Sequence, residues 1–237
     1  MPTETLLELA DLCSGYGSTP VLQGIDLSVQ RGEIVAVIGR NGVGKTRMMR
    51  CLIGQLRAWS GSIRFKGNEI SSRPPEVRAH LGFGYIPQGR EVFPRMTVEE
   101  NLRVGEMIGA RTDAKLYDIV YEFFPILAER RQQKAGTMSG GQQQQLAIGR
   151  AMIGNPGLLL LDEPSEGIQP SIVQDITRVM QRVNRELGTT ILFVEQNLDV
   201  ILALAHRCYV MDKGRIVAER SAEELQDREV AKRDLQI

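Results

Sequence analysis

A glycine-rich segment near the N-terminus constrains the fold more than any other feature of this chain. Residues 39–46 read GRNGVGKT, which has the spacing of a phosphate-binding loop, G-x-x-x-x-G-K-[ST]. In such a loop, glycines let consecutive backbone N–H groups turn toward phosphate oxygens, Lys45 neutralises phosphate charge, and Thr46 can ligate Mg²⁺. Chance produces this pattern in on the order of 1% of chains of this length. The segment therefore predicts a nucleotide-binding site between a strand and a helix.

Three apolar runs predict the sheet that carries this loop. Residues 33–38 (EIVAVI) precede the glycines, residues 158–161 (LLLL) precede Asp162, and residues 190–194 (TILFV) precede Glu195. Runs that are apolar on both faces are typical of buried parallel strands. Between the last two runs, apolar residues recur at helical spacing and indicate a strand–helix–strand unit. The predicted fold class is α/β, a P-loop NTPase core with a mostly parallel sheet.

Short alternating apolar runs predict a separate antiparallel β subdomain at the N-terminus. They occupy residues 5–30 and 61–70, with turn signals at Tyr16-Gly17 and Gln23-Gly24.

The middle of the chain has a different pattern. Residues from about 89 to 155 contain amphipathic helical patterns around 98–108 and 116–124, the second closed by Pro125. This pattern predicts an α-helical subdomain inserted in the nucleotide-binding core. The charge-rich residues 221–237 predict a surface helix, and we expect residues 1–237 to form a single domain.

Composition excludes several classes of protein. The chain has 29 basic and 29 acidic residues among 237, so no summed positive field favours nucleic acid as a partner. Three widely spaced cysteines suit a reducing compartment better than a disulfide framework. No segment approaches the roughly 18 uninterrupted apolar residues of a membrane span. We expect a folded protein that does not cross a membrane by itself.

Two acidic residues at the end of the second apolar run predict the catalytic half of the site. Asp162 follows a predicted parallel strand, where a carboxylate can hold Mg²⁺ directly or through water. Glu163 comes next and can polarise an attacking water as a general base. Acids after a strand can instead cap the following helix, but Pro164 and the loop after it disfavour that alternative.

A second predicted anion-binding helix start identifies a family. Residues 138–142 read MSGGQ, and a single chain has little need of a second such site. Together with Gln88 after a predicted strand, these segments resemble the ATP-binding cassette (ABC) ATPases, and the resemblance covers nearly the whole chain in family order. Two cassettes of that family sandwich two ATP molecules between the phosphate loop of one subunit and the signature serine and glycines of the other. The resemblance implies ATP and Mg²⁺ as cofactors and a dimer with composite sites.

The resemblance also implies roles for individual residues. Tyr16 matches the aromatic residue that stacks on adenine, Gln88 matches the glutamine that senses Mg²⁺ and the membrane partner, and residues 165–170 match the loop at the dimer interface. The implied catalytic residues are Glu163, Gln196 and Gln88, and the implied metal ligands are Thr46, Gln88 and Asp162. The implied nucleotide-binding residues are Tyr16, Gly39, Asn41, Gly42, Val43, Gly44, Lys45, Thr46, Arg47, Ser139, Gly140, Gly141 and Gln142.

Three positions depart from the common family pattern. Met138 replaces the usual leucine before Ser139, a change that conserves volume and should cost little. Gln196 stands where most members carry a histidine that touches the γ-phosphate, and its amide can donate a hydrogen bond but carries no charge. Arg47 stands where the family usually has a second threonine against the α-phosphate. Its guanidinium can pair with phosphate or point to solvent, and the sequence leaves both open.

The exact residues of the motifs point to particular groups within the family. Residues 87–101, 165–170 and 194–197 are similar to the smaller ATPase of branched-chain amino-acid importers and of the related urea and short-amide importers, with the urea branch most similar. We expect an ATP-hydrolysing subunit that powers import of a small polar solute by ATP-driven dimerisation. The alternative is the same chemistry in a non-import machine such as lipid extraction, export or cluster assembly. A GTPase switch is disfavoured because the Asn-Lys-x-Asp segment that reads guanine is absent from the sequence.

The expected partners follow from the same resemblance. They are a second ABC ATPase, identical or different, transmembrane permease subunits, and indirectly a periplasmic or extracellular solute-binding protein. Apolar side chains among charges, including Phe93, predict that the permease docks near Gln88 to Met96. The expected location is peripheral, at the cytoplasmic face of the inner (cell) membrane, and no nucleic acid is expected.

Overall fold

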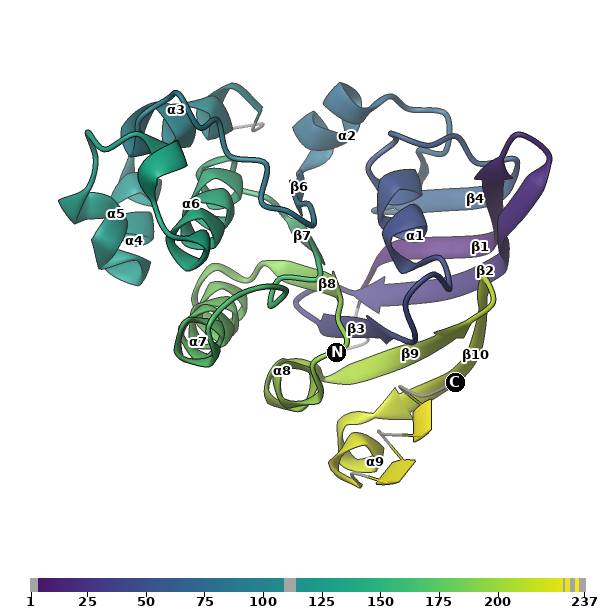
Figure 1. The fold of residues 1–237 in the computed structure, drawn as a ribbon. Helices are drawn as coiled ribbons and strands as arrows, with labels where there is room; N and C mark the ends of the chain where they lie inside the picture. Colours follow the sequence, from purple (N-terminus) through teal and green to yellow (C-terminus); the bar gives the residue numbers. More distant parts are fainter. Residues whose placement is uncertain (1–3, 109–113, 228, 231–232, 235–237) are drawn as a thin grey trace.

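The computed structural model describes residues 4–108, 114–227, 229–230 and 233–234, which form two sheets and surrounding helices (Figure 1). The first sheet is antiparallel, in the order β2-β1-β4-β5, with β1 Thr5–Tyr16, β2 Thr19–Gln30, β4 Ser60–Phe65 and β5 Asn68–Glu69. The second has the order β10-β9-β3-β8-β7-β6, with β3 Ile34–Ile38, β6 Phe83–Ile86, β7 Leu158–Asp162, β8 Thr190–Val194, β9 Arg207–Asp212 and β10 Arg215–Ser221. All its neighbours pair in parallel except β9 and β10. The predicted α/β class with two kinds of sheet is confirmed.

Strand β3 shows why its sequence is apolar without alternation. Ile34, Ala36 and Ile38 face a core shared with helices, whereas Val35 and Val37 face a second core shared with the antiparallel sheet. Successive side chains of a strand point to opposite faces, so a strand buried on both faces needs a continuous apolar run. The six-stranded sheet is therefore the middle layer, and the phosphate loop leaves it from a central strand.

Helices cover both faces of this layer. On one face lie α6 Gly140–Ile153, α7 Pro170–Leu187, α8 Leu198–Leu204 and the short α9 Ala222–Gln226. The other face packs on α1 Lys45–Leu52 and the antiparallel sheet. The short α2 Pro75–Leu81 precedes β6.

A group of helices lies between β6 and β7 in sequence, to the left in Figure 1. It contains α3 Val98–Ile108, α4 Lys115–Phe123, α5 Pro125–Glu129, the 3₁₀ turn Ala135–Thr137 and α6. This agrees with the predicted helical region, although Pro125 begins a helix as well as following one. Proline suits the first helical turn, where its missing N–H has no partner to lose.

One local prediction needs correction. Gly24 does not end a strand: it has φ 75° inside β2, where the register with β1 shifts, so it forms a bulge. The C-terminal segment is helical at Ala222–Gln226 and at residues 229–230 and 233–234, which lie within the predicted surface helix, and residues 228, 231–232 and 235–237 of that helix lie outside the described residues. The hairpin β9–β10 was not predicted, although Lys213 and Gly214, both with positive φ, supply its turn.

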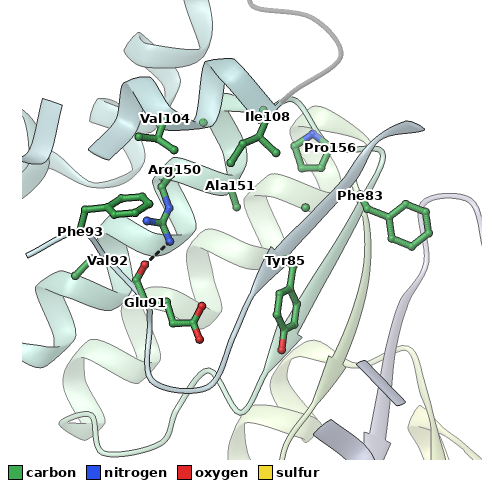
Figure 2. Close-up of a pocket in the computed structure, with 13 residues that line it drawn as sticks. Phe83, Tyr85, Glu91, Val92, Phe93, Val104, Ile108, Arg150, Ala151 and Pro156 are labelled. Atoms are coloured by element: carbon green, nitrogen blue, oxygen red, sulfur yellow. Dashed lines mark hydrogen bonds between the residues drawn. The ribbon is translucent and has the colours of Figure 1, made fainter. Parts of the chain in front are cut away.

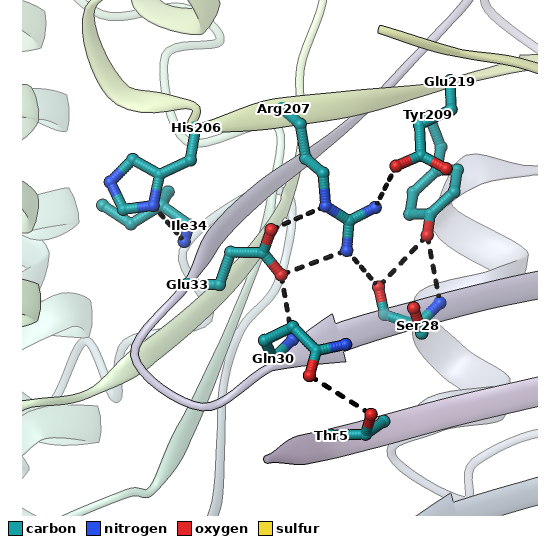
Figure 3. Close-up of polar contacts among 9 residues, drawn as sticks. All are labelled: Thr5, Ser28, Gln30, Glu33, Ile34, His206, Arg207, Tyr209 and Glu219. Atoms are coloured by element: carbon teal, nitrogen blue, oxygen red, sulfur yellow. Dashed lines mark hydrogen bonds and ion pairs between the residues drawn. The ribbon is translucent and has the colours of Figure 1, made fainter. Parts of the chain in front are cut away.

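A network of charges joins the two sheets at β9 (Figure 3). The Arg207 guanidinium donates to Glu33 at 2.6 and 3.0 Å, to Glu219 at 2.9 Å and to the Ser28 carbonyl at 2.7 Å. Burial alone lowers the pKa of Arg207, but hydrogen bonds with Glu33 and Tyr209 outweigh it and raise the pKa above its ordinary value. This network ties the strand next to β3 to the antiparallel sheet.

Candidate functional site

The phosphate loop connects the end of β3 to the start of α1. Gly39 has φ 144°, and a Cβ there would lie 2.2 Å from the Met211 carbonyl oxygen, so only glycine fits. Gly44 caps α1 with φ 115°, which turns the chain directly into the helix. Asn41 is exposed, and Val43 is buried with its carbonyl bonded to Gly214. The loop is therefore anchored on β9–β10 while its other side remains open.

Lys45 is the central cation of the loop and is 4% exposed. Its ammonium group donates to the carbonyls of Gly39 at 2.6 Å and Arg40 at 2.9 Å. Glu163 Oε1 lies 3.7 Å from Nζ. Burial lowers the pKa of Lys45 below its ordinary value, although Glu163 and Asp162 act in the opposite direction. An additional anion at this position would stabilise the charged form.

Asp162, at the carboxyl end of β7, is 1% exposed. It accepts hydrogen bonds from the Thr46 hydroxyl at 3.0 Å and from the Tyr85 hydroxyl at 3.2 Å. Burial raises the pKa of Asp162, and these two hydrogen bonds oppose the shift. The Asp162 carboxylate and the Thr46 hydroxyl present adjacent oxygens of the kind that Mg²⁺ prefers, so this pair fits the metal.

Glu163 lies beside this pair, with φ 48°. Gln196 Nε2 donates to Glu163 Oε1 at 3.0 Å, and Gln88 Nε2 lies 3.5 Å from Oε2. Burial raises the pKa of Glu163, with Lys45 and Gln196 opposing. A carboxylate with a raised pKa next to a phosphate loop has the properties of a general base.

Gln88 does not contact the Thr46–Asp162 pair directly. Its amide donates to Glu166 at 2.8 Å and lies 3.5 Å from Glu163 Oε2. The structure thus brings three predicted catalytic side chains together at Glu163, while two of the three predicted metal ligands contact each other.

Tyr16 and Arg47 form the other end of the site. Tyr16 ends β1 and is 57% exposed, and the Arg47 guanidinium lies over its ring. A cavity of about 470 Å³ connects this pair with the phosphate loop. It is lined by Tyr16, Val21, Asn41, Gly42, Gly44, Lys45, Thr46, Arg47, Arg50, Gln88 and Glu163.

The predicted signature residues lie elsewhere, at the start of α6. Ser139 caps this helix: its hydroxyl accepts from the Gln142 N–H at 3.4 Å, and the Gln142 side chain accepts from the Ser139 N–H at 3.0 Å. Gly140 packs against Arg90, and Gly141 against Ile172. None of residues 139–142 lines the phosphate-loop cavity of this chain. The two predicted anion sites are separate within one chain.

Two site residues were missed by sequence reasoning. Tyr85, on β6, donates a hydrogen bond to Asp162. The sequence offered only its position in a short apolar run two residues before Pro87, which does not indicate a role at the site. Glu195 follows β8 as Asp162 ends β7, and its carboxylate accepts from the N–H groups of Ser165, Gln196 and Asn197 at 3.2, 2.7 and 3.0 Å. Glu195 therefore fixes the backbone that carries Gln196.

A separate groove of about 370 Å³ lies between the helical region and β6 (Figure 2). Arg150 from α6 extends along it, donates to the Glu91 carbonyl at 2.9 Å and lies 5.2 Å from the Phe93 ring centroid. Phe93 is 45% exposed, and Asn101 holds its turn through both backbone groups of Phe93. The lining consists of Phe83, Gly84, Tyr85, Glu91, Val92, Phe93, Val104, Gly105, Ile108, Arg150, Ala151, Gly154 and Pro156.

Comparison with known families and proteins agrees with this geometry. The family model described as ABC transporter matches residues 22–166. The high-affinity branched-chain amino acid transport ATP-binding protein BraG of Pseudomonas aeruginosa is 45% identical over 90% of this chain and 91% of its own. The probable branched-chain amino acid transport ATP-binding protein LivF of Archaeoglobus fulgidus is 34% identical over 94% and 95%. The lipopolysaccharide export system ATP-binding protein LptB of Haemophilus influenzae is 32% identical over 97% and 96%.

Solved structures agree at the level of the whole chain. A nucleotide-free ATP-binding cassette from an ABC transporter superposes with a TM-score of 0.84 at 28% identity, covering 98% of this chain and 99% of that one. The ADP conformation of another ATP-binding cassette, MJ1267, has a TM-score of 0.83 at 30% identity over 97% and 98%. Among the described residues, no helix combines the length and apolar character needed to cross a bilayer.

Proposed function

The chain belongs to the ABC transporter family of ATP hydrolases, and from this premise we propose that it powers an importer for a small polar solute by ATP-driven dimerisation. The solute class is a branched-chain amino acid, urea or a short amide. The observation that carries the proposal is the joint presence of a phosphate loop with Glu163 beside it and a second, outward-facing anion site at Ser139. One chain supplies both halves of a site that it does not close alone.

The solute class is supported by relatives more than by chemistry. BraG and LivF both carry branched-chain amino acid transport in their names, and BraG is 45% identical over 90% of the chain. Export of a lipid is the second candidate, because LptB matches 97% of the chain at 32% identity. The motif wording favours import, and within import it favours the urea branch.

The chemistry follows from the contacts around Glu163. Gln196 and the Lys45 ammonium hold its carboxylate, and its raised pKa gives it the basicity to take a proton from an attacking water. Lys45 and the loop N–H groups bind the phosphates of ATP. Thr46 and Asp162 would hold Mg²⁺, with Gln88 approaching from its own loop, and the metal would neutralise charge that develops on the phosphates.

The dimer completes the site. The start of α6 carries Ser139, Gly140 and Gly141, which do not line the phosphate-loop cavity of their own chain. A nucleotide bound in that cavity would therefore not contact them. A second ABC ATPase, identical or different, supplies the opposite phosphate loop. ATP then bridges the two subunits, and its hydrolysis allows the dimer to open.

The groove at Phe93 and Arg150 is the proposed docking site for a permease. It combines an exposed aromatic ring, apolar walls and a guanidinium held at one edge, which suits a short partner helix with an apolar anchor. The groove joins the loop that carries Gln88, so a partner there can reach Glu163 through that loop. Docking would place the chain peripherally at the cytoplasmic face of the membrane, and a solute-binding protein would act only through the permease.

The test is reconstitution of the chain in proteoliposomes with candidate permease and binding-protein subunits. We expect binding protein loaded with a branched-chain amino acid, urea or a short amide to stimulate ATP hydrolysis several-fold and to drive uptake. Stimulation by none of these, together with stimulation by lipid substrates, would overturn import in favour of export.

Docking is tested in the same assay by a matched pair of variants. Phe93→Asp should abolish stimulation while the isolated chain still hydrolyses ATP. Val217→Asp is the control, because Val217 is also exposed but lies on β10, outside the groove. Equal coupling in both variants would remove Phe93 from the docking site.

A further inference from the structure

Arg47 is a buried cation on α1 whose side chain is not fully paired. It is 6% exposed and lines the same cavity as Lys45 and Tyr16. Its Nη1 has no hydrogen-bond partner within the described part of the chain. A buried guanidinium N–H without an acceptor is costly and uncommon in native proteins. The orphan donor indicates an acceptor that arrives with a ligand.

The Arg47 guanidinium lies over the ring of Tyr16. Its central carbon lies 2.9 Å from the ring centroid. Planar guanidinium groups stack well on aromatic faces. Arg47 directly follows Thr46 of the phosphate loop, and Arg47 and Tyr16 line the same cavity as that loop, so the guanidinium lies between the loop and the ring within one cavity. A base attached to phosphates in the loop would need the same face.

Lys45 and Arg47 both line this cavity but have different partners in it. Lys45 is held near Gly39 and Glu163, where the terminal phosphate would lie, whereas Arg47 extends toward Tyr16. Arg47 is therefore the cation near the sugar end of a bound nucleotide. Burial also lowers the pKa of Arg47, and Cys51 opposes this shift. A nearby phosphate would offset the cost of burying the charged guanidinium.

We propose that Arg47 exchanges partners when a nucleotide binds. The base displaces the guanidinium from Tyr16, and the guanidinium then pairs with the phosphate nearest the sugar, which gives Nη1 its acceptor. This inference deepens the proposed ATP site and rests on it. It assigns to Arg47 opposite effects on the two parts of the ligand: it competes with the base and attracts the phosphates.

The opposite effects can be separated with a ligand that has phosphates but no base. We would measure the dissociation constants of ATP and of inorganic tripolyphosphate by calorimetry, on the full chain without Mg²⁺ so that hydrolysis does not interfere. Arg47→Thr should weaken tripolyphosphate about tenfold, because a charged hydrogen bond to phosphate is replaced at most by the weaker neutral one that a threonine hydroxyl can make. The same variant should weaken ATP by about threefold or less, because the uncovered Tyr16 ring binds the base better.

Arg50→Thr is the matched control. Arg50 lies on the same helix and lines the same cavity, but it is exposed and its side chain is not the one over Tyr16. Its loss should change the affinities for ATP and tripolyphosphate by the same factor. Tyr16→Leu should weaken ATP but leave tripolyphosphate unchanged or tighter, because it releases Arg47.

Several results would overturn the exchange. These are an unchanged tripolyphosphate affinity in Arg47→Thr, equal losses for both ligands, or the same pattern in Arg50→Thr. If Arg47→Thr proves unfolded by its thermal melt, Arg47→Gln keeps the volume of the side chain and gives the same comparison. If the wild-type chain binds ATP but the variants do not change the two dissociation constants as expected, only the exchange is rejected. If the wild-type chain does not bind ATP, the proposed ATP site is rejected as well.

Discussion

The charges around Arg207 and the charges around Glu163 differ in how their neighbours compensate for burial. Around Arg207, every guanidinium nitrogen has an acceptor, and hydrogen bonds outweigh burial so that the pKa of Arg207 rises. Around Glu163, burial outweighs pairing: the pKa of Lys45 falls and the pKa values of Asp162 and Glu163 rise. In the second cluster each group is driven toward its neutral form.

The contrast separates a stabilising network from a site that awaits ligand charge. An ion pair whose donors and acceptors are all hydrogen-bonded to each other has no free group for a phosphate or a metal ion. Lys45 and Glu163 are 3.7 Å apart, and their contact does not offset the cost of burying both charges. Phosphates would stabilise the charged form of Lys45, and Mg²⁺ would stabilise that of Asp162. We therefore expect variants of the first cluster to alter stability and variants of the second to alter binding and turnover.

The largest effect is expected for Glu163→Gln. The shape of the site persists, but the general base is lost, so turnover should fall by about 10² to 10⁴ while ATP still binds. Steady-state phosphate release and ATP calorimetry on the same preparation measure the two quantities. Near-normal turnover would remove Glu163 from the chemistry.

The Glu163→Gln protein also tests the composite site. ATP should drive it into a dimer in analytical ultracentrifugation, and adding Ser139→Asp should prevent this. An aspartate still caps α6, but it puts a carboxylate at an exposed position that is proposed to meet the phosphate of the partner's ATP. Dimer formation that survives Ser139→Asp would contradict the sandwich arrangement.

Lys45→Ala should weaken ATP binding itself, by about 10- to 100-fold, because a cation among phosphate oxygens is worth roughly 1.5–3 kcal/mol. The free energy of unfolding of this variant should change little, because Glu163 and Asp162 only partly offset the cost of burying the Lys45 charge. Calorimetry and a chemical melt would check both. An unchanged ATP affinity would refute the phosphate-loop assignment.

Glu33→Gln is the mirror-image variant in the other cluster. It removes the carboxylate that accepts two bonds from Arg207, and both side chains are largely buried, so the free energy of unfolding should fall by about 1–3 kcal/mol. ATP affinity should remain that of the wild type. A variant with normal stability and weakened ATP binding would erase the distinction between the clusters.

How much the sequence could predict also differs between the clusters. Gly39, Lys45, Thr46, Asp162 and Glu163 were predictable because phosphate chemistry fixes residue types at short spacings along one loop or strand end. The Arg207 network was not, because its members are residues 28, 33, 207 and 219, and they meet only through the pairing of β9 with β3 and β10 and the approach of β2 to β9. Long-range register is absent from local patterns.

Tyr85 and Glu195 were missed for the same reason. Each acts on a residue predicted from another segment, Tyr85 on Asp162 and Glu195 on the backbone of Gln196. The position of Arg47 over Tyr16 likewise required coordinates, because the sequence left that side chain free to point to phosphate or to solvent.

The clusters should also differ in how stability depends on pH. The folded-state pKa of Glu163 is raised by burial, so the native chain holds this proton more tightly than the unfolded chain. Its contribution is therefore most favourable at low pH and is lost as pH rises from the ordinary glutamate value through the folded value. Glu163→Gln should gain stability relative to wild type at pH 7, by about 1 kcal/mol or less, and should not gain at pH 4. Thermal melts at both pH values measure this, and an equal shift at both would show that the carboxylate is not destabilised in the folded chain.

The smallest effect is expected at Gln196, which holds Glu163 without carrying charge. Its amide donates to Glu163 Oε1 at 3.0 Å, and an amide remains a neutral donor at every accessible pH. The wild-type turnover should therefore lack an inflection from an imidazole, since neither His80 nor His206 lines the phosphate-loop cavity. Gln196→His would place at this position a group that titrates near pH 6.5, whose charged form would also lower the pKa of Glu163. We expect ATP binding to persist, turnover to change by a few-fold, and a new pH dependence between about 6 and 7.5 to appear in kcat profiles. A wild-type profile that already bends there, and that straightens on mutation of His80 or His206, would assign the proton chemistry to a histidine outside the site.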